Sequence, residues 1–436
     1  MQKIHKLLSL IIIALLFSIV YSCGKDETVD IPKIKFVNPL HNMSFNVGDT
    51  IVVKVSIESK SSISSVKYSI VDVENKPITT KNSDVQYLVN DDIYEGEIII
   101  SDKYLPSGHY KLICVTYNKI QRKQADIPLI IVGLKKELLE IAVVVKEGAI
   151  TKVKSLQYDL QGTLTDKFSM QTSPVFSVYL PFHNLFTLSA NVIGDLNVWD
   201  YKTQQYVMGI QGQPNPPFPY FTGVASVDKH LAVMFYSEKI ELYNTEGNII
   251  SNLNMHNGYY ANKMKNVGDY YAIIEKSKFT NNDFISFRYK NTGSVYSAFH
   301  WGNNVIDVFP FGNNAALVFL NDNTKAVIGK YIFSESGYSE PVQFNGGKIK
   351  KVCQIDKFNY VFITDDNMYW YQYQTSSITA FASPNTYSYV SYDIVNQNIY
   401  AISGNTIFIY SFPFGNLQSS RMLNNDVLDI HLIYNM

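Results

Sequence analysis

Four segments in the C-terminal two thirds of the chain combine aromatic residues with amides, and they are the best candidates for ligand binding. They are residues 212–221 (GQPNPPFPYF), 256–260 (HNGYY), 299–303 (FHWGN) and 384–387 (PNTY). Aromatic rings supply apolar area for stacking and amides supply oriented hydrogen bonds, which suits sugar rings and other amphipathic ligands. The candidate ligand-binding residues are Phe218, Tyr220, Phe221, His256, Tyr259, Tyr260, His300, Trp301 and Tyr387.

A structural role for the same aromatics is an open alternative. Aromatic residues make up 14% of the chain, so several on one surface are expected by chance. Rings near the start of a strand also pack against neighbouring sheets. Exposure decides between the two roles, because a ring buried between sheets cannot stack on a ligand.

No catalytic signature accompanies these segments. The sequence contains no HExxH, GxSxG, CxxC or Walker motif, and its eight histidines are scattered. Carboxylates are frequent, but nothing singles out a pair. Asp91 and Asp92 lack the spaced series of oxygen ligands that Ca²⁺ requires. We therefore predict no catalytic residue, no metal site and no cofactor.

A repeat near 40–45 residues organises the region that carries the aromatic segments. The clearest copies are residues 196–205 (LNVWDYKTQQ) and 240–248 (IELYNTEGN), each an alternating strand with an aromatic near its end and a polar turn. Copies align on Tyr158, Trp199, Tyr243, Tyr289, Tyr331, Tyr373 and Tyr410, at spacings of 41, 44, 46, 42, 42 and 37 residues. Such a period with only strands inside it is typical of four-stranded propeller blades. Trp199 is therefore predicted to pack between blades.

The ends of this region indicate ring closure. The first copy lacks an innermost strand, while residues 427–434 (VLDIHLIY) form a strand with no blade of its own. If this last strand pairs ahead of residues 141–145, seven blades close without exposed edges. The region resembles seven-bladed β-propellers as an architecture. It lacks the repeated signatures of WD40, kelch and Asp-box proteins.

Residues 34–133 precede the repeat and are predicted to form a separate domain. Pro106 and Gly108 set a turn, after which Tyr110, Leu112 and Cys114 fall on one face of a strand. This pattern resembles the late strand of immunoglobulin-like β-sandwiches, in which a corner tyrosine follows such a turn. The predicted fold is all-β, an immunoglobulin-like β-sandwich over 34–133 and a seven-bladed β-propeller over 141–436. Residues 134–140 form a short linker, with one helical turn.

The N-terminus has the features of an export signal. Lys3 and Lys6 precede an apolar run over residues 7–20, which is too short to span a bilayer comfortably. Residues 20–23 (VYSC) resemble a bacterial lipobox, with Tyr21 bulkier than usual. Residues 24–27 (GKDE) resemble the surface-export signal of Bacteroidetes lipoproteins. We expect a signal peptide over 1–22, lipidation at Cys23 and a tether over 23–33.

The net charge and the cysteine content restrict the possible functions of the chain further. The net charge is −1 for the whole chain, and removing Lys3 and Lys6 with the signal makes it −3. Such a chain offers no basic face for nucleic acid. Cys114 and Cys353 lie far apart in strand patterns, and two separate thiols are favoured over a disulfide.

The resemblance to Bacteroidetes lipoproteins implies a lipid-anchored protein of the outer membrane that faces the exterior. It also implies a non-enzymatic ligand-binding role, accessory to TonB-dependent uptake of glycans or a cofactor, with a transporter or other surface lipoproteins as partners. One alternative is a propeller lyase or glycosidase acting on extracellular polysaccharide. Another is a protein-interaction or adhesion scaffold. Fold alone does not decide among these functions.

Overall fold

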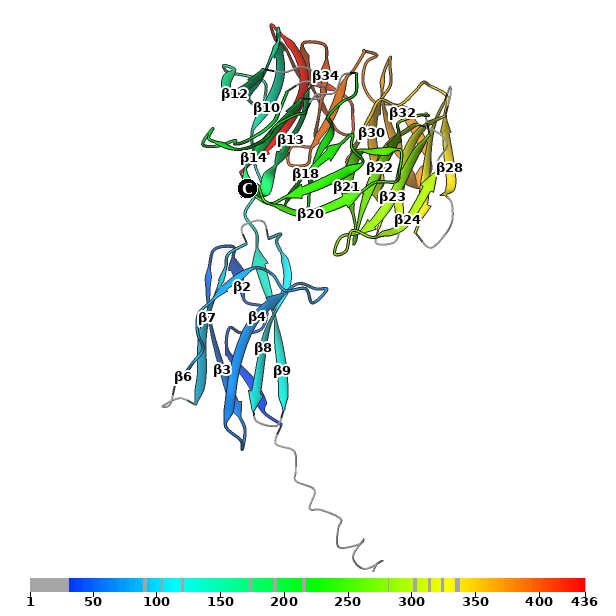
Figure 1. Ribbon diagram of the computed structural model, residues 1–436. Coiled ribbons are helices and arrows are strands. Elements are labelled where there is room, and N and C mark those ends of the chain that lie inside the picture. The colour runs from blue at the N-terminus through cyan, green and yellow to red at the C-terminus, as the bar shows by residue number, and fades with distance from the viewer. Residues whose placement is uncertain are drawn as a thin grey trace, which may run out of the picture. The chain divides into compact units, whose positions relative to one another are not determined.

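The computed structural model describes residues 31–88, 92–102, 105–118, 121–171, 175–190, 194–213, 217–280, 282–300, 304–312, 315–322, 325–333 and 338–435 (Figure 1). The predicted signal peptide and Cys23 lie outside these residues. The chain divides into two compact units, Met1–Lys135 and Lys136–Met436. Their described residues are nearly all strand and loop, and they contain no helix with the length and apolar character to cross a membrane.

The N-terminal unit contains two β-sheets. One has the strand order β1-β3-β7-β5, with β6 also paired to β7, and the other has the order β2-β9-β8-β4. The strands of the first sheet are β1 (Lys33–Asn38), β3 (Thr50–Glu58), β5 (Thr80–Asn82), β6 (Gln86–Leu88) and β7 (Ile93–Ile100). Those of the second are β2 (Ser44–Asn46), β4 (Ile63–Val71), β8 (Gly108–Asn118) and β9 (Arg122–Val132).

One hydrophobic core joins the two sheets into a sandwich. Alternate residues of β3, including Ile51 and Val53, are buried and meet buried residues of β8, including Leu112 and Cys114. This follows from the period of two along a strand, which sends successive side chains to opposite faces. The Tyr110 hydroxyl donates a hydrogen bond of 2.9 Å to the carbonyl of Pro106, four residues upstream.

The second unit contains seven four-stranded antiparallel sheets within the described residues. Their strand orders are β37-β10-β11-β12, β13-β14-β15-β16, β17-β18-β19-β20, β21-β22-β23-β24, β25-β26-β27-β28, β29-β30-β31-β32 and β33-β34-β35-β36. The bounds of the first four sheets are β37 (Asp426–Tyr434), β10 (Leu138–Glu147), β11 (Ile150–Gln157), β12 (Thr165–Gln171); β13 (Val175–Leu180), β14 (Leu185–Ala190), β15 (Leu196–Asp200), β16 (Tyr206–Ile210); β17 (Phe221–Val227), β18 (His230–Phe235), β19 (Lys239–Tyr243), β20 (Ile249–Asn254); β21 (Tyr259–Val267), β22 (Tyr270–Ser277), β23 (Asp283–Tyr289), β24 (Val295–His300).

The remaining three sheets have the same design. Their strands are β25 (Asn304–Pro310), β26 (Ala315–Asp322), β27 (Lys325–Ile332), β28 (Tyr338–Phe344); β29 (Lys351–Gln354), β30 (Asn359–Ile363), β31 (Met368–Gln372), β32 (Ser377–Ala380); β33 (Tyr389–Asp393), β34 (Asn398–Ser403), β35 (Thr406–Ser411), β36 (Leu417–Met422). Two 3₁₀ turns, η1 (Pro181–His183) and η2 (Tyr373–Thr375), complete the elements of this unit among the described residues.

The first strand of each sheet contacts the first strand of the next sheet. These inner strands are β37, β13, β17, β21, β25, β29 and β33, and the last of them contacts β37 again. The sheets therefore surround a common axis, and the second unit is a β-propeller. Hydrophobic clusters fill the spaces between adjacent sheets, as in the cluster shared by β25–β28 and β29–β31.

Strand β37 closes the ring as the sequence predicts. It pairs antiparallel with β10, from Leu138 opposite Tyr434 to Lys146 opposite Asp426. Figure 1 shows this red C-terminal strand beside β10. Side chains on both of its faces are buried against neighbouring sheets, with Ile430 packed beside β34 and β35 and Ile433 beside β14 and β15.

The repeated aromatics lie at or just beyond the end of the third strand of each sheet. Trp199 in β15 stacks on Phe168 in β12 of the preceding sheet, with ring centroids 4.7 Å apart and planes inclined by 9°. The prediction that Trp199 packs between blades is therefore correct. Tyr158 and Tyr289 are instead exposed. The aromatic residue therefore keeps its position in every repeat, but it does not pack between blades in every repeat.

The segment expected to be a linker is shorter than predicted and contains no helical turn. Residues 133–137 have no regular structure, and β10 already begins at Leu138. Leu138 is buried because it packs with residues of β34, β35 and β37. The start of β10 is therefore fixed by pairing with the far end of the chain.

Truncation of β37 tests ring closure. Deleting residues 427–436 should lower the melting temperature sharply, because it leaves β10 with an unpaired edge. The milder change Ile430→Ala removes a side chain with 1% exposure, and we expect a loss of about 2–5 kcal/mol in the free energy of unfolding.

Leu428→Ala is the matched control in urea unfolding. Leu428 is 37% exposed and lies at the bulge of β37, so its truncation should cost about 0.5 kcal/mol. An unchanged melting temperature after deletion of residues 427–436 would contradict closure by this strand.

Candidate functional site

The predicted aromatics lie where one propeller sheet passes to the next. Phe218 and Tyr220 lie between β16 and β17, Tyr259 and Tyr260 begin β21, and His300 ends β24. Trp301 lies outside the described residues, as do three residues of the proline-rich segment. The described members fall into three groups with different environments.

The first group is structural, and it corrects the prediction for two residues. Phe221 and Tyr387 are fully buried, so neither ring can contact a ligand. The Tyr387 hydroxyl lies 2.7 Å from the Tyr410 hydroxyl and donates to the carbonyl of Ser383. Tyr220 packs edge-on against Phe221 in the same interior. Phe221, Tyr387 and Tyr220 therefore have the structural role that the sequence left open as an alternative to ligand binding.

The second group surrounds Phe284 of β23. His256 stacks on Phe284 with centroids 5.1 Å apart, while Tyr259 and His300 meet it edge-on at 4.7 and 4.8 Å. The sequence placed these three residues on the same surface but missed Phe284. Its position in a strand gave no sign that it would join the connecting segments.

His256 is held by a buried carboxylate. Glu275 of β22 has a fully buried side chain, and its Oε2 lies 2.9 Å from both the backbone nitrogen and Nδ1 of His256. Its Oε1 accepts from Ser286 Oγ and lies 3.4 Å from Arg288 Nη2. A buried charge needs such partners, because isolated burial is very unfavourable. His256 therefore anchors the connection before β21.

The third group is a chain of rings that reaches the surface. Phe218 stacks on Tyr236 with centroids 5.4 Å apart and planes inclined by 19°, and Tyr236 contacts Tyr260 at 5.1 Å. Phe218 is 48% exposed. The ammonium of Lys278 lies 4.8 Å from the centroid of Tyr236. We call Phe218, Tyr236, Glu238, Tyr260 and Lys278 the rim patch.

An ion pair fixes the polar side of the rim patch. Lys278 Nζ lies 2.8 Å from Glu238 Oε1, and the backbone N–H of Gly258 donates to the same oxygen at 3.1 Å. The hydrogen bond from Lys278 lowers the pKa of Glu238, so this carboxylate is ionised at neutral pH. Gly258 has φ of +80°, which favours glycine, and its neighbour Phe279 leaves little space for a side chain.

Alternation along β21 explains how the second and third groups form. Tyr259 and Tyr260 are consecutive, so they point to opposite faces of the sheet, one toward Phe284 and the other toward Tyr236. The sequence missed Tyr236 and Glu238, which belong to the turn between β18 and β19. This hairpin meets the segment before β21 through the hydrogen bond from the Gly258 N–H to Glu238.

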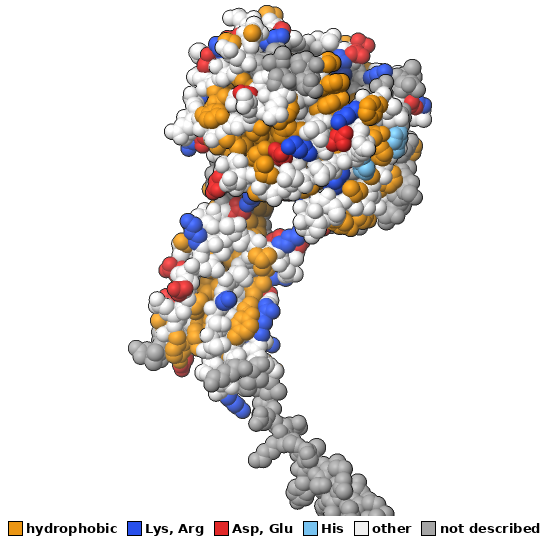
Figure 2. Space-filling model, in the orientation of Figure 1, with side chains coloured by type: hydrophobic (Ala, Val, Ile, Leu, Met, Phe, Trp, Pro, Cys, Tyr) orange, Lys and Arg blue, Asp and Glu red, His pale blue; other side chains and the backbone are white. Residues whose placement is uncertain are grey.

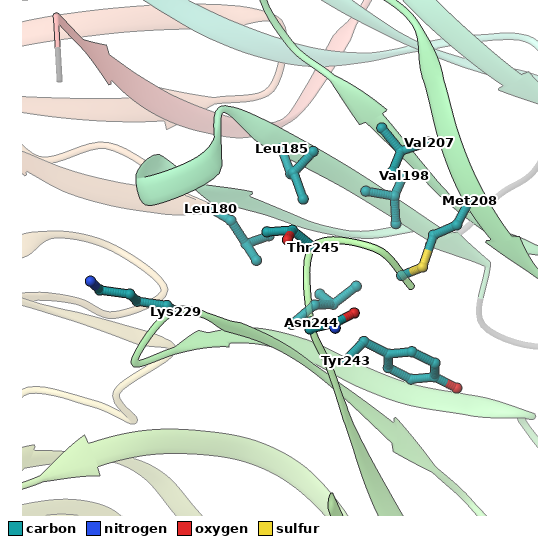
Figure 3. A pocket seen from close by; sticks show the side chains of 10 residues that line it. Leu180, Leu185, Val198, Val207, Met208, Lys229, Tyr243, Asn244 and Thr245 are labelled. Carbon is teal, nitrogen blue, oxygen red and sulfur yellow. The ribbon is translucent and has the colours of Figure 1, made fainter. Parts of the chain in front are cut away.

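The crevice in Figure 3 is a packing defect and not a second site. It lies between the sheets β13–β16 and β17–β20, where Leu185, Val198 and Met208 face the Asn244–Thr245 turn. It has no volume that a water molecule can enter. Figure 2 shows acidic and basic side chains interspersed over one face, in line with the near-neutral net charge.

Ser177, His431 and Asp429 meet on β13 and β37, but they do not form a catalytic relay. Ser177 Oγ lies 2.9 Å from His431 Nε2 and donates to Asp429 Oδ2 at 2.6 Å. Asp429 Oδ2 also approaches Nε2 of His431, at 3.5 Å. In a catalytic triad the carboxylate binds the other ring nitrogen and the serine proton goes to histidine. Within the described residues, no cluster of His, Cys, Asp or Glu fits a metal ion.

Comparison with known proteins adds information on the fold alone. No protein-family model matches the chain, and no curated protein matches it significantly. The chain is similar to one from the crystal structure of the Mitotic Checkpoint Complex, with TM-score 0.47 and 11% identity, covering 58% of this chain and 78% of that chain. It is similar to the Dos1 propeller, with TM-score 0.46, 10% identity, and 67% and 88% coverage. The chain is also similar to Hsv2 of Kluyvelomyces marxianus, with TM-score 0.39 and 10% identity, covering 55% of this chain and 72% of that chain. The assignment as a propeller rests on the ring of sheets described above.

Replacement of Glu275 tests the buried network beside the rim. Glu275→Gln should lower the free energy of unfolding by about 3 kcal/mol, because Arg288 then remains buried without its carboxylate. Urea unfolding at neutral pH measures the loss. Glu246→Gln, in an exposed turn, is the control and should change it by about 0.5 kcal/mol at most. Equal effects of the two changes would contradict a structural role for Glu275.

Proposed function

We propose that this chain is a non-enzymatic ligand-binding lipoprotein whose propeller holds a glycan at the rim patch. The observation that carries the proposal is the stacked pair of Phe218 and Tyr236, which leaves the Phe218 ring 48% exposed beside a charged hydrogen-bonding pair. A sugar has apolar ring faces and a polar edge. Exposed rings next to Lys278 and Glu238 complement both.

The rim patch has a largely pre-formed geometry. Tyr236 is held between Phe218 and Tyr260, and Lys278 is fixed by Glu238. Fewer side-chain rotations are therefore lost when a ligand binds, which favours affinity. The stacking in the rim patch differs from the setting of Tyr206, which is 60% exposed and meets Trp199 edge-on at a centroid distance of 6.4 Å.

We further propose that the seven sheets are the blades of one seven-bladed propeller and that the N-terminal sandwich is immunoglobulin-like. The inner strands contact one another in a cycle of seven. In the sandwich, the hydrogen bond from Tyr110 to the Pro106 carbonyl has the form of a tyrosine corner, which is common in immunoglobulin-like domains.

The proposed setting is the outer membrane, with the chain anchored through Cys23 and facing the exterior. Its support is the sequence alone, namely the lipobox-like residues 20–23 and the GKDE segment after them. A TonB-dependent transporter or other surface lipoproteins are the proposed partners. A stable anchor needs more than one acyl chain or a second membrane-binding signal, since a single chain gives only marginal membrane binding.

Ligand titration tests the rim patch. Calorimetry of the lipid-free chain with neutral oligosaccharides of starch, cellulose, mannan and xylan should give binding with one of these classes. Phe218→Ala and Tyr260→Ala should each weaken it about tenfold, corresponding to about 1.4 kcal/mol. Tyr206→Ala removes a ring of 60% exposure on the outer strand β16 and should leave affinity unchanged.

Three outcomes would replace this proposal. Binding that survives both rim changes would place the glycan elsewhere. Release of shorter oligosaccharides would make the protein an enzyme. Absence of binding to all four glycan classes would favour the interaction scaffold.

Replacement of Cys23 tests the anchor. Cys23→Ser should abolish incorporation of labelled palmitate and move the protein from the membrane fraction to the soluble fraction. Cys114→Ser is the matched control, because Cys114 is a buried free thiol and should not affect labelling. Palmitate incorporation in the Cys23→Ser variant would show that lipidation, if any, occurs at another residue.

A further inference from the structure

The inner strands of the propeller enclose a second site, which we call the channel cavity. It has a volume of about 460 Å³ and is lined by residues of β17, β21, β25, β29 and β33. The aromatic residues of the rim patch do not line it. Its polar lining is dominated by three lysines, Lys263, Lys265 and Lys351.

The buried carboxylate of Asp307 forms ion pairs with two of these lysines. Asp307 Oδ1 lies 2.6 Å from Lys265 Nζ, and its Oδ2 lies 3.2 Å from Lys263 Nζ. Lys263 Nζ also donates to the carbonyl of Ile306 at 2.8 Å. Burial works to raise the pKa of Asp307, but Lys265 and Lys263 outweigh it and lower this pKa. Asp307 is therefore ionised and balances one of the two positive charges.

The ammonium group of the third lysine, Lys351, lies over an aromatic ring, at a position where an anionic partner is expected. Lys351 Nζ lies 3.3 Å from the centroid of Tyr389, whose hydroxyl donates to the carbonyl of Ile430 at 2.8 Å. Among the described residues, no carboxylate lies within ion-pair distance of Lys351. Burial lowers the pKa of Lys351, and the more distant Asp429 works in the opposite direction.

A second carboxylate, Asp429, lies outside the cavity lining and offsets part of the charge of Lys351 from beyond ion-pair distance. Asp429 accepts from Ser177 and from the backbone N–H of Ile430, and it lies beside His431. Burial raises the pKa of Cys353 to about 12, so this thiol brings no negative charge at neutral pH. The lining thus has three lysines against one carboxylate, Asp307, with Asp429 as a second carboxylate outside the lining, and burial lowers the pKa of Lys265 as well as that of Lys351.

The apolar residues that border the channel cavity are largely buried. Met264, Val352 and Val390 alternate with channel-facing residues and belong to the cores between sheets. Phe309 is also buried, and Lys265 Nζ lies 3.6 Å from the centroid of its ring. A cavity with an unbalanced cation favours a small anion over a neutral ligand.

We propose that the channel cavity binds a small anion, with its carboxylate or phosphate group at Lys351. This site is independent of the glycan site at the rim patch. Oxyanions suit it because a lysine ammonium offers three donors as a compact positive charge. The bound anion would supply the anionic partner that Lys351 lacks within ion-pair distance among the described residues.

Thermal shift and calorimetry of the lipid-free chain test this site with citrate, glucuronate and inorganic phosphate, at low and moderate ionic strength. At least one should bind with a dissociation constant of about 1 mM or tighter, and added salt should weaken it. Preference for citrate or glucuronate identifies a carboxylate site, and preference for phosphate identifies a phosphate site. Absence of binding by all three would overturn the proposal.

Lys351→Met is the decisive variant. It keeps an apolar stem over Tyr389, removes the unpaired charge, and should weaken anion binding at least tenfold. It should also raise the melting temperature of the ligand-free protein, because it removes a partly buried cation that has no carboxylate within ion-pair distance among the described residues. Lys202→Met, on an exposed turn, is the control and should change neither quantity. Unchanged anion affinity in Lys351→Met would overturn the proposal even if the rim patch binds glycans.

Discussion

The pairing of β37 with β10 is the contact on which the rest of the propeller depends. It joins residues almost 300 positions apart in sequence and turns an open row of sheets into a ring. Each sheet then has a neighbour on both faces, so its apolar side chains are buried on both sides. The inner strands are also brought around one axis, and this creates the channel cavity. Closure thus provides both the stability of the ring and the convergence of residues that are remote in sequence.

Much of this architecture can be predicted from local sequence patterns. The aromatics near the ends of third strands and the polar turns after them are short-range signals, and they located the sheets correctly around Trp199 and Tyr243. The start of β10 was missed because it is decided by Tyr434, at the other end of the chain. A linker and a strand have the same local appearance at Leu138, and only the distant partner distinguishes them.

The residues of the two candidate sites divide in the same way. Some can be selected from the local sequence, and others come together only through contacts with distant parts of the chain. Residue type selected Phe218 and Tyr260, which belong to the rim patch, but it also selected Phe221 and Tyr387, whose burial depends on neighbouring sheets. Tyr236 and Glu238 look like an ordinary hairpin turn until Gly258 and Lys278 approach them. The three channel lysines lie in strand patterns that resemble solvent-facing positions. No sequence signal places Lys351 near Asp307, because their strands are brought together only by the ring.

The order of synthesis gives ring closure a further consequence. Strand β10 is synthesised long before its partner β37. The ring therefore cannot close until β37 has been made, and until then the nascent chain must keep the edge of β10 available. Contacts of such large sequence separation also slow folding. The rate of ring closure is thus limited by the longest-range strand pairing in the propeller.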